Sequence, residues 1–220
     1  GTETWIGHTT TFHRVQVFPG LWVHLYGVTP AGARFPTGKL LEYSLGVSDA
    51  AGGVDHAPFE AIVAADKLAY PGFSLPTFHL QAPGAKLNAL YGSCRKPHGD
   101  KGGPLDALSY GDSLILNNAS ELGTRPAALC LGGDQIYADD VDPVVFDAVA
   151  SIAAKLEKGQ PEALPAGATL PGKGQRQDFM TRTARFTSGE AANHLVTFAE
   201  FVAMYGLVFN AGNWPGTALP

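Results

Sequence analysis

The chain has 220 residues, of which 45% are hydrophobic and 16% are charged, and its formal net charge is -5 at pH 7. This composition excludes a disordered chain, because it supplies enough apolar side chains for a core, and the negative charge argues against binding to a nucleic-acid backbone. No stretch approaches the roughly 20 apolar residues of a membrane-spanning helix, so we expect no membrane span.

The first part of the chain has the pattern of short strands separated by turns. Between residues 9 and 85, runs of β-branched and aromatic residues such as 12–18 and 21–28 are interrupted by Gly and Pro. This pattern predicts an amino-terminal, Ig-like antiparallel β-sandwich domain over residues 1–85. Helical spacing within it predicts a short helix over 57–67.

The pattern changes at residue 86, where strands and helices begin to alternate. We expect strands over 87–93 and 127–133, and helices over 104–118 and 142–158. Asp142 is a suitable N-cap for the last of these and Pro143 suits its first turn. Its apolar side is predicted to consist of Val144, Phe146, Val149, Ile152, Ala153 and Leu156. The order strand, helix, strand, helix predicts parallel strands, and ligands bind at the carboxyl ends of such strands.

The remainder of the chain is predicted to form a loop and then a helix. Residues 159–177 are rich in Pro and Gly and show no period, which predicts a surface loop. A helix is expected over 188–210, with His194 and Glu200 on its polar side or in contact with further polypeptide. Its apolar stripe is predicted to consist of Leu195, Phe198, Phe201, Val202 and Tyr205.

The two cysteines are predicted to be free thiols. Cys94 lies at the end of one predicted strand, whereas Cys130 lies about four residues before the end of the neighbouring one. This offset corresponds to roughly 13 Å, which is beyond the reach of a disulfide. We expect Cys130 to lie in the core.

The two strand ends carry the residues that indicate chemistry: residues 92–99 (GSCRKPHG) and 132–140 (GGDQIYADD). Both ends should face one crevice. A thiolate from Cys94, a carboxylate from Asp134 and a phenolate from Tyr137 would form an electron-rich site for a trivalent or strongly Lewis-acidic metal, as in a nuclease or phosphatase.

These residues resemble the PhoD-like (alkaline phosphatase D-like) metallophosphoesterases, whose first strand ends in Ser-Cys and whose second ends in Gly-Asp-x-Ile-Tyr. The likeness extends to residues 40–43 (LLEY) and to the segment 193–215. It implies that Cys94 and Tyr137 bind an iron-like ion, Fe(III), and that Asp134 bridges to a second ion, Ca(II), although other divalent ions are possible. It also implies that residues 86–220 form the first βαβα part of a metallophosphoesterase α/β core.

The sequence departs from the family after Tyr137, because no Asp-Asp-His-type motif or later metal-binding histidines follow. Asn193-His194 resembles the Asn-His ligand motif of broader metallophosphoesterases, but it leads into a predicted helix, so we do not expect it to bind metal. The chain begins at Gly1 without Met and ends at Pro220. We therefore expect a fragment with the first half of a metal site, which pairs with the remaining polypeptide or with itself.

Each candidate also has an ordinary structural explanation. Cys94 could be a buried thiol, Asp134 a turn cap and Tyr137 a packing residue. Arg95 could clamp a phosphate as a catalytic and substrate-binding residue, or remain a solvated charge like Lys96. His98 could contact substrate and shuttle protons, or be structural. Asp139, Asp140 and Asp142 cluster where a helix begins, and carboxylates are favoured there without a metal.

The sequence therefore predicts that the parent protein hydrolyses phosphate mono- or diesters with two metal ions. The alternative is a non-catalytic binding or interaction module built on the β-sandwich. A different α/β hydrolase is less favoured, because the chain has no Gly-x-Ser-x-Gly motif.

Overall fold

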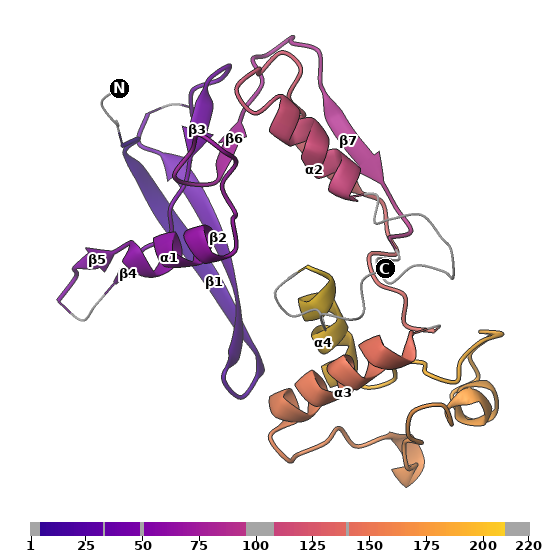
Figure 1. Ribbon diagram of the computed structural model, residues 1–220. Helices are drawn as coiled ribbons and strands as arrows, with labels where there is room; N and C mark the ends of the chain where they lie inside the picture. Colours follow the sequence, from indigo (N-terminus) through magenta and orange to yellow (C-terminus); the bar gives the residue numbers. More distant parts are fainter. Residues whose placement is uncertain (1–4, 33, 49–50, 96–107, 140, 210–220) are drawn as a thin grey trace. The chain divides into compact units, whose positions relative to one another are not determined.

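Strands and helices follow one another along the chain and give a mixed α and β fold, as predicted. Figure 1 shows the computed structural model, which describes residues 5–32, 34–48, 51–95, 108–139 and 141–209. The chain divides into two units. One takes its described residues from 1–10, 28–92 and 108–131, and the other from 11–27, 93–107 and 132–220.

The amino-terminal strands pair two by two. The elements of this region are the hairpin strands β1 (His8–Phe18) and β2 (Leu21–Pro30), the antiparallel pair β3 (Leu40–Glu42) and β6 (Thr77–His79), the antiparallel pair β4 (Val47–Ser48) and β5 (Val54–Asp55), and helix α1 (Ala57–Ala65). Gly20 has a φ of 89° in the two-residue turn of the hairpin, a conformation that glycine adopts at little cost. The small antiparallel sheets and the short helix are confirmed, whereas their Ig-like arrangement stays a prediction.

A parallel pair of strands follows, as the order of elements predicted. Strand β7 (Ala89–Gly92) pairs with β8 (Ala128–Leu131), and helix α2 (Leu108–Asn117) lies between them in the chain. Ala89 is opposite Ala128 and Gly92 is opposite Leu131, so the two carboxyl ends lie next to each other. The segments that follow these ends must therefore start side by side.

Helix α3 (Pro143–Glu157) begins where its cap residues predict. The Asp142 side chain accepts a hydrogen bond of 2.8 Å from the backbone N–H of Val144, and Pro143 occupies the first turn. Its buried side chains are Val145, Phe146, Val149 and Ala153. The prediction placed Val144 on this side, but Val144 is 44% exposed and Val145 is buried in its place.

Helix α4 (Phe198–Val208) begins ten residues later than predicted. Thr197 and Glu200 form a capping box, in which the Thr197 hydroxyl accepts from the Glu200 N–H and the Glu200 carboxylate accepts from the Thr197 N–H. The cap sets the start of the helix, and residues 188–197 form turns and loops instead. The predicted stripe was right only in part, because Leu195 is buried and Phe201 packs against the core, whereas Phe198 and Tyr205 are more than 45% exposed.

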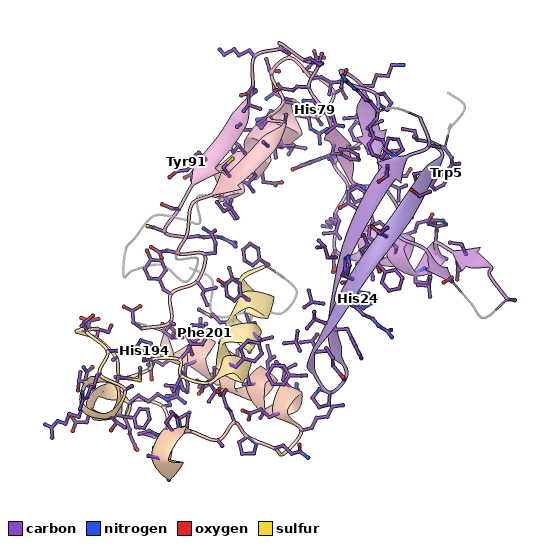
Figure 2. All side chains as sticks on the ribbon, turned by 180° about the vertical axis from the view of Figure 1, so that it is seen from behind. Trp5, His24, His79, Tyr91, His194 and Phe201 are labelled. Carbon is purple, nitrogen blue, oxygen red and sulfur yellow. The ribbon has the colours of Figure 1, made fainter. Side chains whose placement is uncertain are left out.

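The main core lies between α3 and α4, which lie side by side in Figure 1. Leu195, in the loop before α4, is fully buried within it, and Phe201, labelled in Figure 2, packs against it. The buried side chains of this core are Val141, Val145, Phe146, Val149, Ala153, Leu195, Ala199, Ala203, Met204, Leu207 and Val208. The loop that connects the two helices also includes a 3-10 turn (Pro165–Gly167) and a π-helical turn (Phe179–Thr183).

A buried ion pair joins the connecting loop to the start of α4. The Arg176 guanidinium donates two hydrogen bonds to the Glu200 carboxylate, with Nη2 to Oε1 at 2.7 Å and Nη1 to Oε2 at 3.0 Å. Both side chains are over 90% buried. The sequence placed Glu200 on a polar helix face, but buried charges need full pairing, and Arg176 provides it.

The other partners of this pair come from four backbone groups and one ring. Glu200 Oε2 accepts from the N–H groups of Val196 and Thr197; Arg176 donates to the carbonyls of Pro171 and His194 and lies 4.7 Å from the centre of the Phe146 ring. The pair therefore connects the loop, α3 and α4 through one set of contacts.

In the first unit the buried side chains are mainly polar. Val63 is the one buried residue among its described apolar residues, and the polar residues His79 and Arg125 are also buried. Arg125 donates to the carbonyl and the hydroxyl of Thr77 at 2.8 and 2.9 Å. The His79 Nε2 atom is buried and has no hydrogen-bond partner among the described residues. Burial, and then the charge of Arg125, lower the pKa of His79.

None of the helices in the described ranges has the length and apolar character that crossing a lipid bilayer requires.

We predict that Glu200→Leu lowers the free energy of unfolding by about 3–5 kcal/mol, because it leaves the buried Arg176 charge unpaired. Urea unfolding of both proteins measures this loss. Asp178→Ala is the matched control, since it removes an exposed ion pair with Arg182 and should change the stability by less than about 0.5 kcal/mol. Equal effects of the two substitutions would contradict the assigned role of the buried pair.

We also predict that stability falls as the pH is lowered through about 6.5, in part because of His79. Since the pKa of His79 is lowered in the folded chain, the unfolded chain takes up the proton first and gains stability relative to the folded one. His79→Leu should therefore reduce the loss of stability between pH 7 and pH 5, as measured by urea unfolding across this range. An unchanged pH dependence in the variant would count against the prediction.

Candidate metal centre

The candidate residues follow two neighbouring parallel strands. Cys94 comes two residues after the end of β7, and Asp134 comes three residues after the end of β8. Backbone pairing continues past both ends, because the N–H of Cys94 donates to the Gly133 carbonyl at 3.1 Å and the N–H of Arg95 donates to the Asp134 carbonyl at 2.8 Å. These bonds hold the two loops next to each other.

The three predicted ligand side chains are close together. The Cys94 thiol donates to Asp134 Oδ2 at 3.4 Å, and the Tyr137 hydroxyl forms a hydrogen bond with the Cys94 sulfur. The Ser93 hydroxyl also donates to this sulfur, at 3.6 Å. Cys94 and Asp134 are exposed and Tyr137 is half-buried. A thiol, a carboxylate and a phenol therefore meet at a place that solvent can reach.

The pKa of Tyr137 is raised above the usual value for a phenol. The largest cause is its hydrogen bond with Cys94, followed by the loss of surrounding water and by the negative charges of Cys94, Asp134 and Asp139. The phenol therefore holds its proton in the metal-free chain, and a cation at this position would reverse the balance by favouring the phenolate.

Each of the two loops contains a candidate ligand with a positive φ near its start. Cys94 has a φ of 57° and Asp134 has a φ of 50°, so both lie in the left-handed region. Such a conformation costs about 1–2 kcal/mol for a residue with a Cβ atom, and it occurs mainly where the surroundings force it, commonly at functional sites. The strain falls on two of the three predicted ligands.

The donor set suits a metal ion but is incomplete. Sulfur and phenol oxygen are ligands for transition metals, and a carboxylate can bridge to a harder cation such as calcium. In the described part of the chain, no group of three or more His, Cys, Asp or Glu side chains is placed to hold a metal. Cys94 and Asp134 are two side chains of these types, and Tyr137, a residue of another type, supplies the third donor.

Sequence reasoning missed Gln135, which lies between the ligand candidates. Its side-chain nitrogen donates to the Gly133 carbonyl, while its Oε1 atom is buried without a hydrogen-bond partner among the described residues. Buried polar atoms are rarely left unpaired, and an amide oxygen is a suitable ligand for a hard cation. In the sequence, the one signal for a role of Gln135 is its position next to Asp134.

Arg95 is held by the end of helix α4. Its Nη1 atom donates to the Val208 carbonyl at 3.0 Å, and its guanidinium lies 5.2 Å from the centre of the Phe209 ring. A cation is favoured at a helix C-terminus, where carbonyl groups lack helical partners. These contacts hold the guanidinium of Arg95, the residue that follows Cys94. A role of Arg95 in binding phosphate stays a prediction.

Several other candidates have structural roles or cannot be placed. Lys96, His98 and Asp140 lie outside the described residues. Asp139 accepts a hydrogen bond of 3.0 Å from the Ser188 hydroxyl. Asp142 caps α3, which confirms its structural explanation.

The two cysteines are free thiols, as predicted, but Cys130 is not in the core. Cys130 is opposite Tyr91 in the register of β7 and β8, and both residues are exposed. The interior position was inferred from the apolar sequence of the strand. All four residues of β8 are exposed, so the described residues cover neither face of this strand.

Asn193 and His194 have structural partners. The Asn193 amide nitrogen donates to the Val141 carbonyl at 3.1 Å, and its oxygen accepts from the Gly174 N–H at 2.8 Å. His194, labelled in Figure 2, is buried, with its Nδ1 atom 2.6 Å from the Leu195 carbonyl and its ring 5.2 Å from that of Phe186. The expectation of a polar helix face for His194 was wrong, because its segment is a buried turn before α4.

Searches for similar proteins among family models, curated proteins and solved structures give no significant match.

We predict that glycine is the better replacement at Cys94. Cys94→Gly should be more stable than Cys94→Ala by about 1 kcal/mol, because glycine adopts a positive φ without strain. At Cys130, which lies in a strand, the order should reverse, with Ala more stable than Gly by about 0.5–1 kcal/mol. Thermal unfolding of the four variants measures both differences, and the same order at both positions would refute backbone strain at Cys94.

Proposed function

We propose that the chain supplies part of a metal site in a protein that hydrolyses phosphate mono- or diesters. The convergence of Cys94, Asp134 and Tyr137 on the loops after two parallel strands supports this proposal most directly. Sulfur, carboxylate and phenol oxygen are all metal-binding groups, and ligand sites are common at the carboxyl ends of parallel strands.

The proposed ions are Fe(III), held through Cys94 and Tyr137, and Ca(II), which shares Asp134 with it. When bound, such ions stabilise negative charge on a phosphoryl group and make water a stronger nucleophile. Cys94 and Tyr137 would each give up a proton to take part. The Gln135 oxygen, which has no hydrogen-bond partner among the described residues, is proposed as a further donor for the harder ion.

Two residues are proposed to act on the substrate. Arg95 lies on the same loop as Cys94, and its planar guanidinium suits two phosphate oxygens. His98, which comes four residues after Cys94 in the sequence, is also proposed to contact substrate. Because Arg95 is already held by Val208 and Phe209, it would act from a fixed position and lose little side-chain freedom on binding.

The wider arrangement is proposed from the same likeness to PhoD-like metallophosphoesterases. The parallel β7–α2–β8–α3 order is compatible with the first part of their α/β core, and the small antiparallel sheets are compatible with an Ig-like domain before it. The missing ligands would come from the remaining part of the protein or from self-association.

We predict that the complete protein, in which the remaining ligands are present, retains about one equivalent of iron when it is mixed with Fe(III) and gains a visible absorption band from phenolate and thiolate ligands. Tyr137→Phe should weaken and shift this band, and Asp134→Asn should abolish stoichiometric metal binding and any hydrolysis of 4-nitrophenyl phosphate or bis(4-nitrophenyl) phosphate. Elemental analysis and absorption spectra supply the measurements.

The controls for this prediction lie on the same two strands. Tyr91→Phe changes a tyrosine of β7 that is 80% exposed, and Cys130→Ser changes the second exposed thiol. Both should leave the iron content and the band unchanged, whereas Cys94→Ser should reduce both. Wild-type protein that retains no metal, or a band that depends on Tyr91 as much as on Tyr137, would sink the proposal.

A second candidate function is a non-catalytic interaction role for the β1–β2 hairpin. One observation favours it: Phe12, Trp22 and Tyr26 are 58%, 42% and 47% exposed on this ribbon. Exposed aromatic groups of this kind mark interaction surfaces. This function requires no metal, so the iron measurement separates it from the first.

A further inference from the structure

The position of Tyr137 depends on a segment that lies far from it in the sequence. Tyr137 belongs to residues 132–142, which have no regular secondary structure where they are described. A side chain on such a loop keeps a fixed place only if other parts of the protein hold its backbone. We call residues 188–195 the clamp segment, because they provide these contacts.

The clamp segment contacts three residues that follow Tyr137. The Leu195 N–H donates to the Ala138 carbonyl at 2.7 Å, and the Ser188 hydroxyl donates to Asp139 Oδ2 at 3.0 Å. Asn193 donates to the Val141 carbonyl at 3.1 Å. Leu195 and Val141 are fully buried, so the hydrogen bonds at this end are largely protected from competing water.

Asn193 also joins the clamp segment to the loop that carries the buried ion pair. Its oxygen accepts from the Gly174 N–H, while its nitrogen holds Val141. An amide can accept on one side and donate on the other, whereas an ionised carboxylate has no donor. Two residues away from Gly174, Arg176 donates to the His194 carbonyl and pairs with Glu200.

We infer that Asn193 is a positioning residue, which fixes the loop of Tyr137 and through it the contact between Tyr137 and Cys94. This inference deepens the proposed function, and it rests on that function only where it concerns metal binding. In the metal-free chain it concerns geometry alone. Residues that hydrogen-bond directly to a metal ligand commonly change metal affinity by 10- to 100-fold when they are replaced, and Asn193, which contacts the loop of Tyr137 and not a ligand, should have a smaller effect.

The test uses Asn193→Asp, which keeps the acceptor for Gly174 but removes the donor to Val141. Gln177→Ala is the matched control. Gln177 accepts from the Ala191 N–H at 2.7 Å, so its loss weakens the same clamp segment without removing a contact to the loop of Tyr137. Both variants should lose about 1 kcal/mol of stability, which is the usual net value of a hydrogen bond.

The readout is the fluorine NMR signal of Tyr137 in metal-free chain labelled with 3-fluorotyrosine, identified by its absence in Tyr137→Phe. We expect this signal to shift or broaden in Asn193→Asp and to stay in place in Gln177→Ala. A merely structural role predicts the same spectrum for both variants, because both are destabilised alike. An unmoved Tyr137 signal in Asn193→Asp, or equal changes in both variants, would overturn the inference.

A second measurement separates this inference from the proposed function. If the complete wild-type protein binds Fe(III), Asn193→Asp should bind it up to about 10-fold more weakly, and Gln177→Ala should bind it as the wild type does. If the complete wild-type protein binds no metal but the fluorine signal moves only in Asn193→Asp, the positioning role stands and the proposed function fails. Unchanged iron affinity in Asn193→Asp would confine the inference to the metal-free chain and contradict its functional part.

Discussion

The buried pair of Arg176 and Glu200 is the interaction on which most of the second unit depends. Two charges removed from water are stable only when every donor and acceptor finds a partner. The Glu200 carboxylate accepts hydrogen bonds from the guanidinium and from N–H groups at the start of α4. The guanidinium also donates to two loop carbonyls and lies over the Phe146 ring. One misplaced partner would leave a buried charge unsatisfied, so the pair specifies a single arrangement of the loop and both helices.

This arrangement allows the candidate site to hold unfavourable conformations. The left-handed backbone at Cys94 stores strain of about 1–2 kcal/mol, and that at Asp134 stores less, because aspartate adopts this conformation more readily. That strain persists only if surrounding contacts determine the loops, and here they include backbone hydrogen bonds between the loops and the hold of α4 on Arg95. A packed helical core therefore provides what two short strands cannot: a fixed setting for three reactive side chains.

The sequence predicted features that are set locally and missed those set by packing. Asp142 and Pro143 mark the start of α3, because a cap acts within one turn. The loops of Cys94 and Asp134 could be placed together because parallel strands leave a sheet at one edge.

The start of α4 was misjudged, although Thr197 and Glu200 have the spacing of a capping box, because the apolar residues before them also fit a helical period. Which of Val144 and Val145 is buried depends on where α4 lies, which no local pattern contains. The roles of Arg176 and Asn193 rest on partners about 20 and 50 residues away in the chain.

The exposed hairpin and the metal candidates place different demands on the protein. Only the tip of the hairpin joins the core, where the rings of Phe18 and Phe198 stack with centres 5.5 Å apart. Beyond the tip, its aromatic side chains remain exposed, and a two-stranded ribbon has little stability of its own. An interaction surface can tolerate this, because a partner supplies the missing burial on binding. A strained set of metal ligands cannot, because its geometry has to exist before the ion arrives if binding is to be strong. The chain places the candidate ligands on loops held by its packed helices, which is the reason that metal chemistry is the stronger of the two proposals.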